Sequence, residues 1–378
     1  MKVLYIGSDV QVCGAGFSMI KLVEELKKIG VNVVPVVRNG NSEKLLSESN
    51  IEHYTIDAQS WTMKRTYSRL KTLVYMIAKK ALNVRCYYEY KRIIKKENPD
   101  IVHINALTTY VGAKAAIASS KPVVWHIREM LEEDFNVQFW NKKEAYELMR
   151  KASCFIAISK CVEEKYKKVV GAEKIKCIYN GVDKEVFFNP DHEIFVDDKI
   201  RITMAGRINV SKGQLSCMKS LAKILKENPN IVLSFAGTGD DSEIKKIKQV
   251  QKDYDIPDEQ VVFLGFVKEM GKLWSETDIA VVYSRFEAFG RVTVEAKMAG
   301  ALVVGFNSGG TTELIEDGVD GFLFDGDNIG LREVMLKILA DKQSAKNIAV
   351  NGRTKAVNVF TSENNARHIV TLYDRILK

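Results

Sequence analysis

The stretch "SRFEAFGRVTVEAKMAG", residues 284–300, carries the pattern that recurs along this chain. The apolar run at residues 279–283 before it is typical of a buried strand, and residues 292–298 have the composition of a helix. Glu287 and Glu295 stand on either side of a Phe-Gly turn between the two. Because open parallel sheets bind ligands beyond the carboxyl ends of their strands, this junction is a candidate binding loop.

Short apolar runs alternate with helix-like segments in both halves of the chain, which predicts an α/β protein with parallel sheets. The expected strands of the first half are residues 3–7, 31–37, 101–105, 123–127, 155–159 and 176–179. Those of the second half are residues 200–205, 231–237, 261–266, 279–283, 302–306 and 322–324. Since 378 residues exceed what one core usually serves, we predict two domains. We expect the N-terminal domain to span residues 1–188 and the C-terminal domain residues 189–360, followed by a last helix at residues 361–378.

The composition is that of a soluble globular protein, with 46% hydrophobic and 28% charged residues. No apolar run approaches the ~20 residues that a membrane span needs, and the N-terminus lacks the pattern of a signal peptide. Six scattered cysteines favour free thiols in a reducing cytoplasm. Five histidines without ligand-like spacing disfavour a structural metal site.

The net charge of +8 is unevenly distributed. Residues 1–130 hold 20 basic and 11 acidic residues, whereas residues 200–330 hold 15 and 19. Segment 61–96 is the most basic, with 11 basic residues, only Glu89 acidic, and aromatic residues interleaved. It suits either a solvated helix pair or a surface for anionic lipid headgroups or a polyanionic acceptor. Nucleic acid is disfavoured because no nucleic-acid motif accompanies the charge. The candidate acceptor or membrane residues are Lys64, Arg65, Arg69 and Lys71.

Two further loops carry groups that suit a phosphorylated ligand. Arg207 and Lys212, in "GRINVSKG", stand between an expected strand end and a helix, where a diphosphate would be bound by a guanidinium fork and an ammonium. The alternative is two exposed basic residues in a loop. Gly16, in the glycine-rich turn after the first strand, would let backbone approach an anion at a helix N-terminus, although a plain tight turn fits equally.

The quoted turn suits the sugar part of such a ligand. Phe289 and Gly290 fall where a helix begins, so their amides would lack intrahelical acceptors. Glu287 and Glu295 would accept hydrogen bonds from the vicinal diols of ribose or hexose. Together these groups describe a clamp on a nucleotide sugar. The alternative is that Glu287 caps the helix and Glu295 is a surface residue.

The motif Glu287-x7-Glu295, within "SRFEAFGRVTVEAKMAGALVVGFNSGGTTELIEDGVDGFLF", resembles the signature of retaining glycosyltransferase family 4 (glycosyl transferases group 1), of the GT-B fold. Other segments match in order along nearly the whole chain: Gly14-Ala15-Gly16, "NPDIVHINA", "VVWHIRE", "AISKCVEEKY", "YNGVDKEVF", "GRINVSKG", "FAGTGDD" and "FLGFV". The resemblance implies two Rossmann-like parallel-sheet domains facing across a cleft. The C-terminal helix would pack back on the first, acceptor-binding domain.

The resemblance also implies roles for individual residues. Arg207 and Lys212 would hold the donor diphosphate, Glu295 the ribose and Glu287 the donor sugar. His126, in "WHIRE", matches a histidine between donor and acceptor, although a lone histidine at a strand end is more often structural. The expected catalytic residues are thus His126, Glu287, Arg207 and Lys212. The expected donor-binding residues are Gly16, Arg207, Lys212, Glu287, Ala288, Phe289, Gly290, Arg291 and Glu295.

The chain departs from the family pattern at several positions. Tyr283 replaces a common proline, Arg291 replaces an aliphatic residue and could place a cation near the donor, and Phe17 and Ser18 stand where relatives carry a basic residue. The only D-x-D, at residues 325–327, follows an expected strand and is interpreted as turn chemistry rather than a metal motif.

The resulting hypothesis is a retaining glycosyltransferase that is either free in the cytoplasm or peripheral on the inner face of the cell membrane. It would use a nucleotide-diphosphate sugar as co-substrate, UDP-sugar in preference to GDP-sugar, with no cofactor and no metal. The acceptor would be a glycan or lipid-linked sugar in cell-surface polysaccharide biosynthesis. The alternatives are another GT-B enzyme, such as a sugar-nucleotide epimerase, and a non-catalytic sugar-binding protein.

Overall fold

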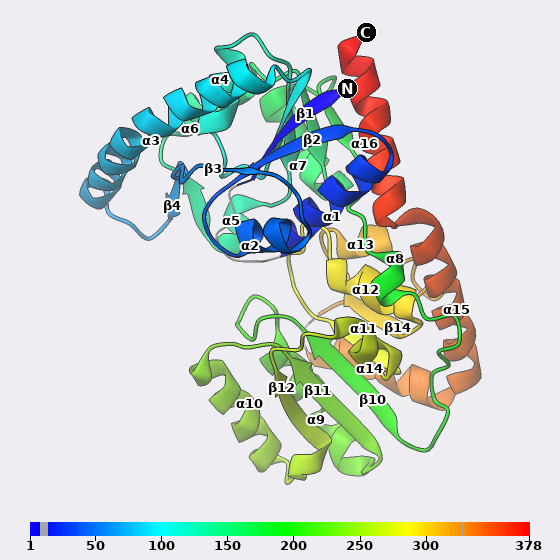
Figure 1. Ribbon diagram of the computed structural model, residues 1–378. Coiled ribbons are helices and arrows are strands. Elements are labelled where there is room, and N and C mark those ends of the chain that lie inside the picture. The colour runs from blue at the N-terminus through cyan, green and yellow to red at the C-terminus, as the bar shows by residue number, and fades with distance from the viewer. Residues whose placement is uncertain (8–13, 327) are drawn as a thin grey trace. The chain divides into compact units, whose positions relative to one another are not determined.

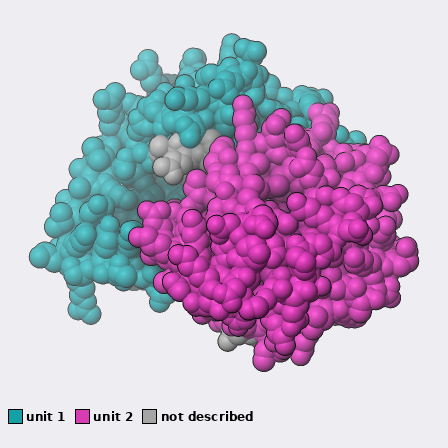
Figure 2. All heavy atoms as spheres, turned by 90° about the horizontal axis from the view of Figure 1, so that it is seen from below, with its two compact units in different colours: residues 1–181, 362–378 teal, residues 182–361 magenta. Residues whose placement is uncertain are grey.

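The computed structural model describes the chain except residues 8–13 and 327. The described residues form two compact units, Met1–Gly181 with Ser362–Lys378, and Val182–Thr361 (Figure 2). Each unit contains one parallel sheet with helices packed against it, so the predicted pair of Rossmann-like domains is confirmed. All twelve expected strands are present, each within two residues of its predicted bounds.

The sheet of the first unit has the strand order β3-β2-β1-β5-β6-β8-β9 (Figure 1). Its strands are β1 (Lys2–Ile6), β2 (Asn32–Val37), β3 (Tyr54–Thr55), β5 (Ile101–Asn105), β6 (Val123–Ile127), β8 (Cys154–Ala157) and β9 (Ile175–Cys177). The unit's helices are α1 (Gly14–Lys28), α2 (Asn41–Glu48), α3 (Arg69–Glu97), α4 (Val111–Ile117), α5 (Leu131–Phe135), α6 (Lys142–Met149), α7 (Lys160–Val170) and α16 (Ser362–Leu377).

The final helix α16 completes the core of the first unit, as predicted. It packs on α1, and Ala366, Ile369, Leu372 and Tyr373 join the buried cluster built from β1, β2 and α1. Its apolar positions recur at helical spacing, so that one face of the helix is buried.

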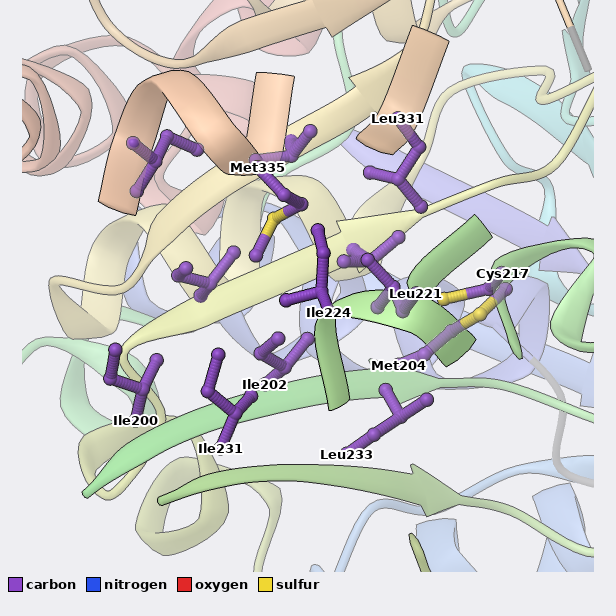
Figure 3. Close-up of a cluster of buried hydrophobic side chains, with 14 of the residues drawn as sticks. Ile200, Ile202, Met204, Cys217, Leu221, Ile224, Ile231, Leu233, Leu331 and Met335 are labelled. Carbon is purple, nitrogen blue, oxygen red and sulfur yellow. The ribbon is translucent and has the colours of Figure 1, made fainter. Parts of the chain in front are cut away.

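The sheet of the second unit has the order β12-β11-β10-β13-β14-β15. Its strands are β10 (Ile200–Ala205), β11 (Ile231–Ala236), β12 (Val261–Gly265), β13 (Ile279–Val282), β14 (Leu302–Phe306) and β15 (Phe322–Phe324). Its helices are α8 (Lys184–Phe187), α9 (Gln214–Glu227), α10 (Asp241–Asp253), α11 (Met270–Ser275), α12 (Arg291–Ala299), α13 (Thr311–Leu314), α14 (Asn328–Ala340) and α15 (Lys342–Val359), with a 3-10 turn at Asp258–Gln260. Figure 3 shows how side chains of β10, β11, α9 and α14 interdigitate in its core.

The division between the units follows Gly181, earlier than the expected division after residue 188. The reason is that residues 182–188 belong to the second unit by their contacts. Val182 bridges Thr361 and donates its N–H to the carbonyl of Phe360, and α8 packs on α11 and α12.

Segment 61–96 is not the helix pair considered from its sequence. It contains β4 (Thr62–Lys64), which pairs antiparallel with β7 (Val137–Phe139), and one long helix, α3. Two of its aromatic residues are in the core: Trp61 stacks on Tyr110 at 4.6 Å between ring centroids, and Tyr90 is 1% exposed. Within the described residues, none of the helices has the length and apolarity required to cross a bilayer.

Candidate active site

Three neighbouring strands of the second unit bring its functional loops together. Strand β13 pairs with β10 on one side and β14 on the other, so the loops at 206–213, 283–290 and 307–310 all leave the same edge. The third loop supports the second: the N–H of Gly310 donates to the carbonyl of Glu287 at 2.8 Å. A Cβ at Gly309, whose φ is +55°, would lie 2.8 Å from that same carbonyl oxygen, so this close approach requires glycine.

Lys212 and Glu287 meet across two of these loops. The Lys212 Nζ lies 2.5 Å from the Glu287 Oε1, and their side chains are 34% and 18% exposed. Helix α12 begins directly after Gly290. The φ of Gly290 is +94°, a backbone conformation that glycine adopts without strain. The first N–H groups of a helix lack intrahelical acceptors and favour anions. The partly exposed Lys212 ammonium, the Glu287 carboxylate and the N-terminus of α12 therefore lie at the same edge of the sheet.

Glu295 is held by Arg291 one turn away on α12. Its Oε1 accepts from the Arg291 Nε at 3.1 Å and from Nη2 at 3.0 Å. Glu295 is 7% exposed, so the interpretation of Glu295 as a surface residue is wrong. The Arg291 guanidinium thus fixes the orientation of a carboxylate beside the start of the helix.

The other candidates of the donor loops are placed less centrally. Arg207 leaves β10 with a side chain that is 72% exposed, and its Nη2 lies 3.5 Å from the Asp240 Oδ1 on the next loop. Ala288 and Phe289 are buried beneath the turn. Gly16 lies in helix α1 of the first unit and not in the expected turn, and residues 8–13 of the expected loop at 8–17 lie outside the described residues.

His126 lies in a buried polar network at the carboxyl ends of β5 and β6 in the first unit. Its Nδ1 is 3.2 Å from the His103 Nε2 and 3.4 Å from the Arg128 Nη2. The other ring nitrogen of His103 is 2.5 Å from the Tyr373 hydroxyl on α16. Burial and the nearby Arg128 guanidinium hold the pKa values of both histidines well below the usual range, so both rings are neutral.

The contacts of this network assign its protons. A guanidinium only donates, so the His126 Nδ1 accepts and its proton resides on Nε2. His103 then donates from Nε2 and accepts the Tyr373 hydroxyl hydrogen at Nδ1. The buried His126 Nε2 has no hydrogen-bond partner in the described chain. His126 therefore offers a hydrogen-bond donor, and it is not arranged as a base.

Sequence reasoning missed the rest of this network. Arg128 donates to Asn105 at 2.5 Å, to Asn180 at 2.6 Å and to Tyr5 at 3.3 Å. The polar residues of the two expected strands could have predicted this network, because Asn105 pairs in register with His126. Polar residues at alternate positions on two adjacent buried strands share one face.

The acceptor or membrane candidates Lys64, Arg65, Arg69 and Lys71 are all exposed, on β4, the following turn and the start of α3. Asp325 accepts a hydrogen bond from the Asn307 Nδ2 at 3.2 Å beside Gly326, whose φ is +77°, and Asp327 lies outside the described residues. Among the described side chains, no three His, Cys, Asp or Glu residues gather as metal ligands would.

Comparison with known proteins places the chain among glycosyltransferases, which agrees with the resemblance of its motifs. The family described as glycosyl transferases group 1 matches residues 187–355, and glycosyltransferase family 4 matches residues 12–186. The two matches together cover residues 12–355. The chain therefore belongs to the glycosyltransferase family that these two descriptions define, and it is a glycosyltransferase.

Individual relatives cover the chain to different extents. A Bacillus anthracis N-acetyl-alpha-D-glucosaminyl L-malate synthase is 28% identical over 57% of this chain and 58% of its own length. An Escherichia coli UDP-Gal:alpha-D-GlcNAc-diphosphoundecaprenol alpha-1,3-galactosyltransferase is 26% identical over 75% of this chain and 77% of its own. The crystal structure of Anabaena HepE in complex with UDP and glucose superposes with a TM-score of 0.79 at 24% identity, covering 99% of each chain.

Proposed function

We propose that this glycosyltransferase is a retaining enzyme that moves a sugar from a UDP-sugar to a glycan or lipid-linked sugar, in the assembly of cell-surface polysaccharide. The observation that carries the proposal is the Lys212–Glu287 pair beside the N-terminus of α12. It combines a cation and helix amides for a diphosphate with an acceptor for sugar hydroxyls.

The donor would be bound within the second unit. Lys212 and Arg207 contact the diphosphate, and Glu295, oriented by Arg291, accepts from the ribose hydroxyls. Glu287 contacts the donor sugar, with the amides around Phe289 and Gly290 against its hydroxyls or a phosphate. The HepE complex contains UDP and glucose, which supports a UDP-sugar as the donor class.

In the proposed reaction, the bond from the anomeric carbon to the diphosphate breaks, and the acceptor oxygen bonds to that carbon on the same face. The acceptor proton passes to an oxygen of the leaving diphosphate. Lys212 and the helix amides stabilise the charge that develops there. His126 contributes its Nε2–H to an oxygen of the reacting groups. Because the leaving diphosphate takes the acceptor proton, the proposed reaction needs no side chain as a general base.

The acceptor side of the proposal rests on the first unit. The Escherichia coli relative is named for a diphosphoundecaprenol-linked substrate, which supports a lipid-linked acceptor. The N-terminal half of α3 exposes apolar side chains among its basic residues, and Figure 1 shows it extending beyond its sheet. Leu70, Leu73, Val74 and Ile77 are between 48% and 73% exposed. Apolar and basic groups together suit peripheral binding to an anionic membrane at its inner face.

A panel of nucleotide sugars tests the proposal. A UDP-sugar should raise the melting temperature of the protein, and Lys212→Ala should remove most of that shift. Lys223→Ala, on an exposed turn of α9, is the matched control and should leave it unchanged. Incubating the stabilising donor without acceptor should give no epimer. If no nucleotide sugar stabilised the protein, the donor site assigned here would be wrong.

A further inference from the structure

A lysine is buried in the interior of the second unit, on a helix of the candidate donor site. Lys297 lies on α12 and is 1% exposed, although an ammonium in a protein interior is unfavourable unless it is paired and hydrogen-bonded. It stands two residues after Glu295, and side chains two apart on a helix do not share a face. The side of α12 that bears Lys297 is therefore nearly opposite to the side that bears Glu295.

The Lys297 ammonium connects α12 to two neighbouring segments. Its Nζ donates to the carbonyl of Leu314, the last residue of α13, at 2.6 Å. It also lies 2.5 Å from the Oδ1 of Asp320, whose side chain is 3% exposed. Burial lowers the pKa of Lys297 to about 8, and the hydrogen bond to Asp320 opposes that fall, so the group is charged at pH 7. Because carbonyls at the end of a helix lack intrahelical donors, this ammonium fixes the end of α13.

Asp320 holds this pairing in one arrangement. Its Oδ1 also accepts the N–H of Glu316 at 2.9 Å, and its Oδ2 accepts from the Lys355 Nζ on α15 at 2.5 Å. The carboxylate therefore joins α12, α15 and the loop after α13 through three donors. A buried ion pair contributes little net stability, because dehydration offsets its attraction, but breaking it is costly. The elements that it joins are thus held in place.

The opposite end of α13 supports the candidate donor site. This helix is one turn long, Thr311–Leu314. Gly310, directly before it, donates its N–H to the carbonyl of Glu287 at 2.8 Å. Lys297 thus fixes one end of a short helix whose other end holds the loop that bears Glu287. Since Glu295 is on the same helix as Lys297, a movement of α12 against α13 would change the separation between Glu295 and Glu287.

We propose that Lys297 is a positioning residue of the donor site, which sets the separation of Glu295 and Glu287 by holding α12 against α13. The inference rests on the proposed function, in which Glu295 binds the ribose and Glu287 the sugar of one donor molecule. A ligand that bridges both carboxylates needs their correct spacing, whereas UDP uses only the first of them. Lys297 should therefore matter more for the nucleotide sugar than for UDP.

The test compares Lys297→Met with Lys355→Met. Methionine keeps the apolar stem and removes the charge, and in each variant Asp320 retains the other lysine as its partner. Calorimetric titration measures the affinity of each variant for UDP and for the UDP-sugar that most raises the melting temperature of the parent. Lys297→Met should weaken binding of that UDP-sugar at least about fivefold more than binding of UDP. Lys355→Met, the matched control, should leave the ratio of the two affinities unchanged.

This ratio separates positioning from stability, because a loss of folded protein lowers both affinities by the same factor. Amide hydrogen exchange adds a measurement that needs no ligand. The peptide that contains Gly310 should exchange faster in Lys297→Met than in the parent, and not in Lys355→Met. If Lys297→Met does not fold, Lys297→Gln takes its place with a smaller expected effect, because its amide can still donate to the Leu314 carbonyl.

The outcomes distinguish this inference from the proposed function. An unchanged ratio of the two affinities in Lys297→Met, or an equal change in Lys355→Met, would overturn the role of Lys297 and leave the donor site standing. Equal exchange of the Gly310 peptide in all three proteins would overturn that role as well. Failure of the parent to bind UDP or any UDP-sugar would overturn the proposed function, and the role of Lys297 would fail with it.

Discussion

The two units surround their cations with different groups, as the buried Lys297 of the second unit and the buried Arg128 of the first show. In the second unit the cations face carboxylates: Lys212 meets Glu287, and the buried Lys297 lies 2.5 Å from Asp320. In the first unit, Arg128 is surrounded by amide, hydroxyl and imidazole groups.

This difference has a chemical consequence. In the proposed donor site, a diphosphate at Lys212 would compete with Glu287 for the ammonium, so binding would exchange part of one ion pair for another. In that proposal, the exchange would release Glu287 toward sugar hydroxyls and so couple diphosphate binding to sugar recognition. Arg128 of the first unit, whose guanidinium donates to amide and hydroxyl groups, needs no such exchange. We expect its surfaces to respond to anions directly, and the second unit to discriminate among donors.

The largest expected effect concerns the exposed basic residues of the first unit. Replacing Lys64, Arg65, Arg69 and Lys71 together by glutamate should weaken binding to anionic vesicles by roughly a thousandfold, at about 1 kcal/mol per charge. Vesicle sedimentation measures this, and binding by the parent protein should fall as salt rises. The matched control reverses the four exposed lysines of α10, at positions 245, 246, 248 and 252. Equal weakening of vesicle binding in both variants would mean that binding depends on net charge and not on where the basic residues lie.

The next effect tests the ion-pair exchange in the second unit. Lys212→Ala should weaken UDP binding by about 1.5–3 kcal/mol, because a charge-assisted contact to diphosphate is lost. Glu287→Ala should leave UDP affinity unchanged or raised, since it frees the Lys212 ammonium, yet it should weaken binding of the intact donor. Calorimetric titration with UDP and with the nucleotide sugar separates these results. A parallel fall in UDP affinity for both variants would contradict the exchange.

His126→Ala should lower turnover about 10- to 100-fold, as expected for one lost hydrogen bond in the transition state, with little change in donor affinity. Comparison of kcat with the donor Kd measures this. His126→Gln, whose side-chain amide can also donate, should recover part of the rate. Full turnover in the alanine variant would return His126 to a structural role.

A smaller effect is expected from Tyr373→Phe, which removes the hydroxyl that satisfies the His103 Nδ1. An unsatisfied buried acceptor costs about 1–3 kcal/mol of the free energy of unfolding, part of which repacking can recover. If the network also fixes the His126 proton, the variant loses turnover beyond what its stability explains. Chemical denaturation and kcat, each measured on the same preparation, distinguish the two effects.

The same histidines make stability depend on pH. Their pKa values are lower in the folded protein than the ordinary 6.5, so the unfolded chain binds more protons as pH falls below about 6.5. Stability of the first unit should therefore decline on acidification through that range. Replacing His103 by asparagine should flatten the decline, as followed by urea unfolding at several pH values.

The sequence was sufficient to predict the two sheets, because each buried parallel strand is a short apolar run that ends at a polar loop. It also predicted Lys212, Glu287 and Glu295 as candidate site residues, because the first two lie in loops of recognisable composition and Glu295 lies on the helix that follows. It could not predict the Arg291–Glu295 pairing or the burial of Trp61, because rotamers and tertiary packing decide these.

The smallest expected effect is none: transfer activity should survive excess chelator. The reason is the proposed donor site, in which Lys212, Arg207 and the N-terminus of α12 would provide the positive charge that a divalent ion would otherwise supply to the leaving diphosphate. Asp325 is occupied by a hydrogen bond from Asn307 at a glycine turn, in keeping with turn chemistry. Sugar transfer is assayed with and without EDTA, then with added Mg²⁺ or Mn²⁺. Activity that disappears with EDTA and returns with the ion would assign Asp325 and Asp327 to a metal. In that case the cations of the second unit would be insufficient for the diphosphate, and the contrast between the two units would have to be redrawn.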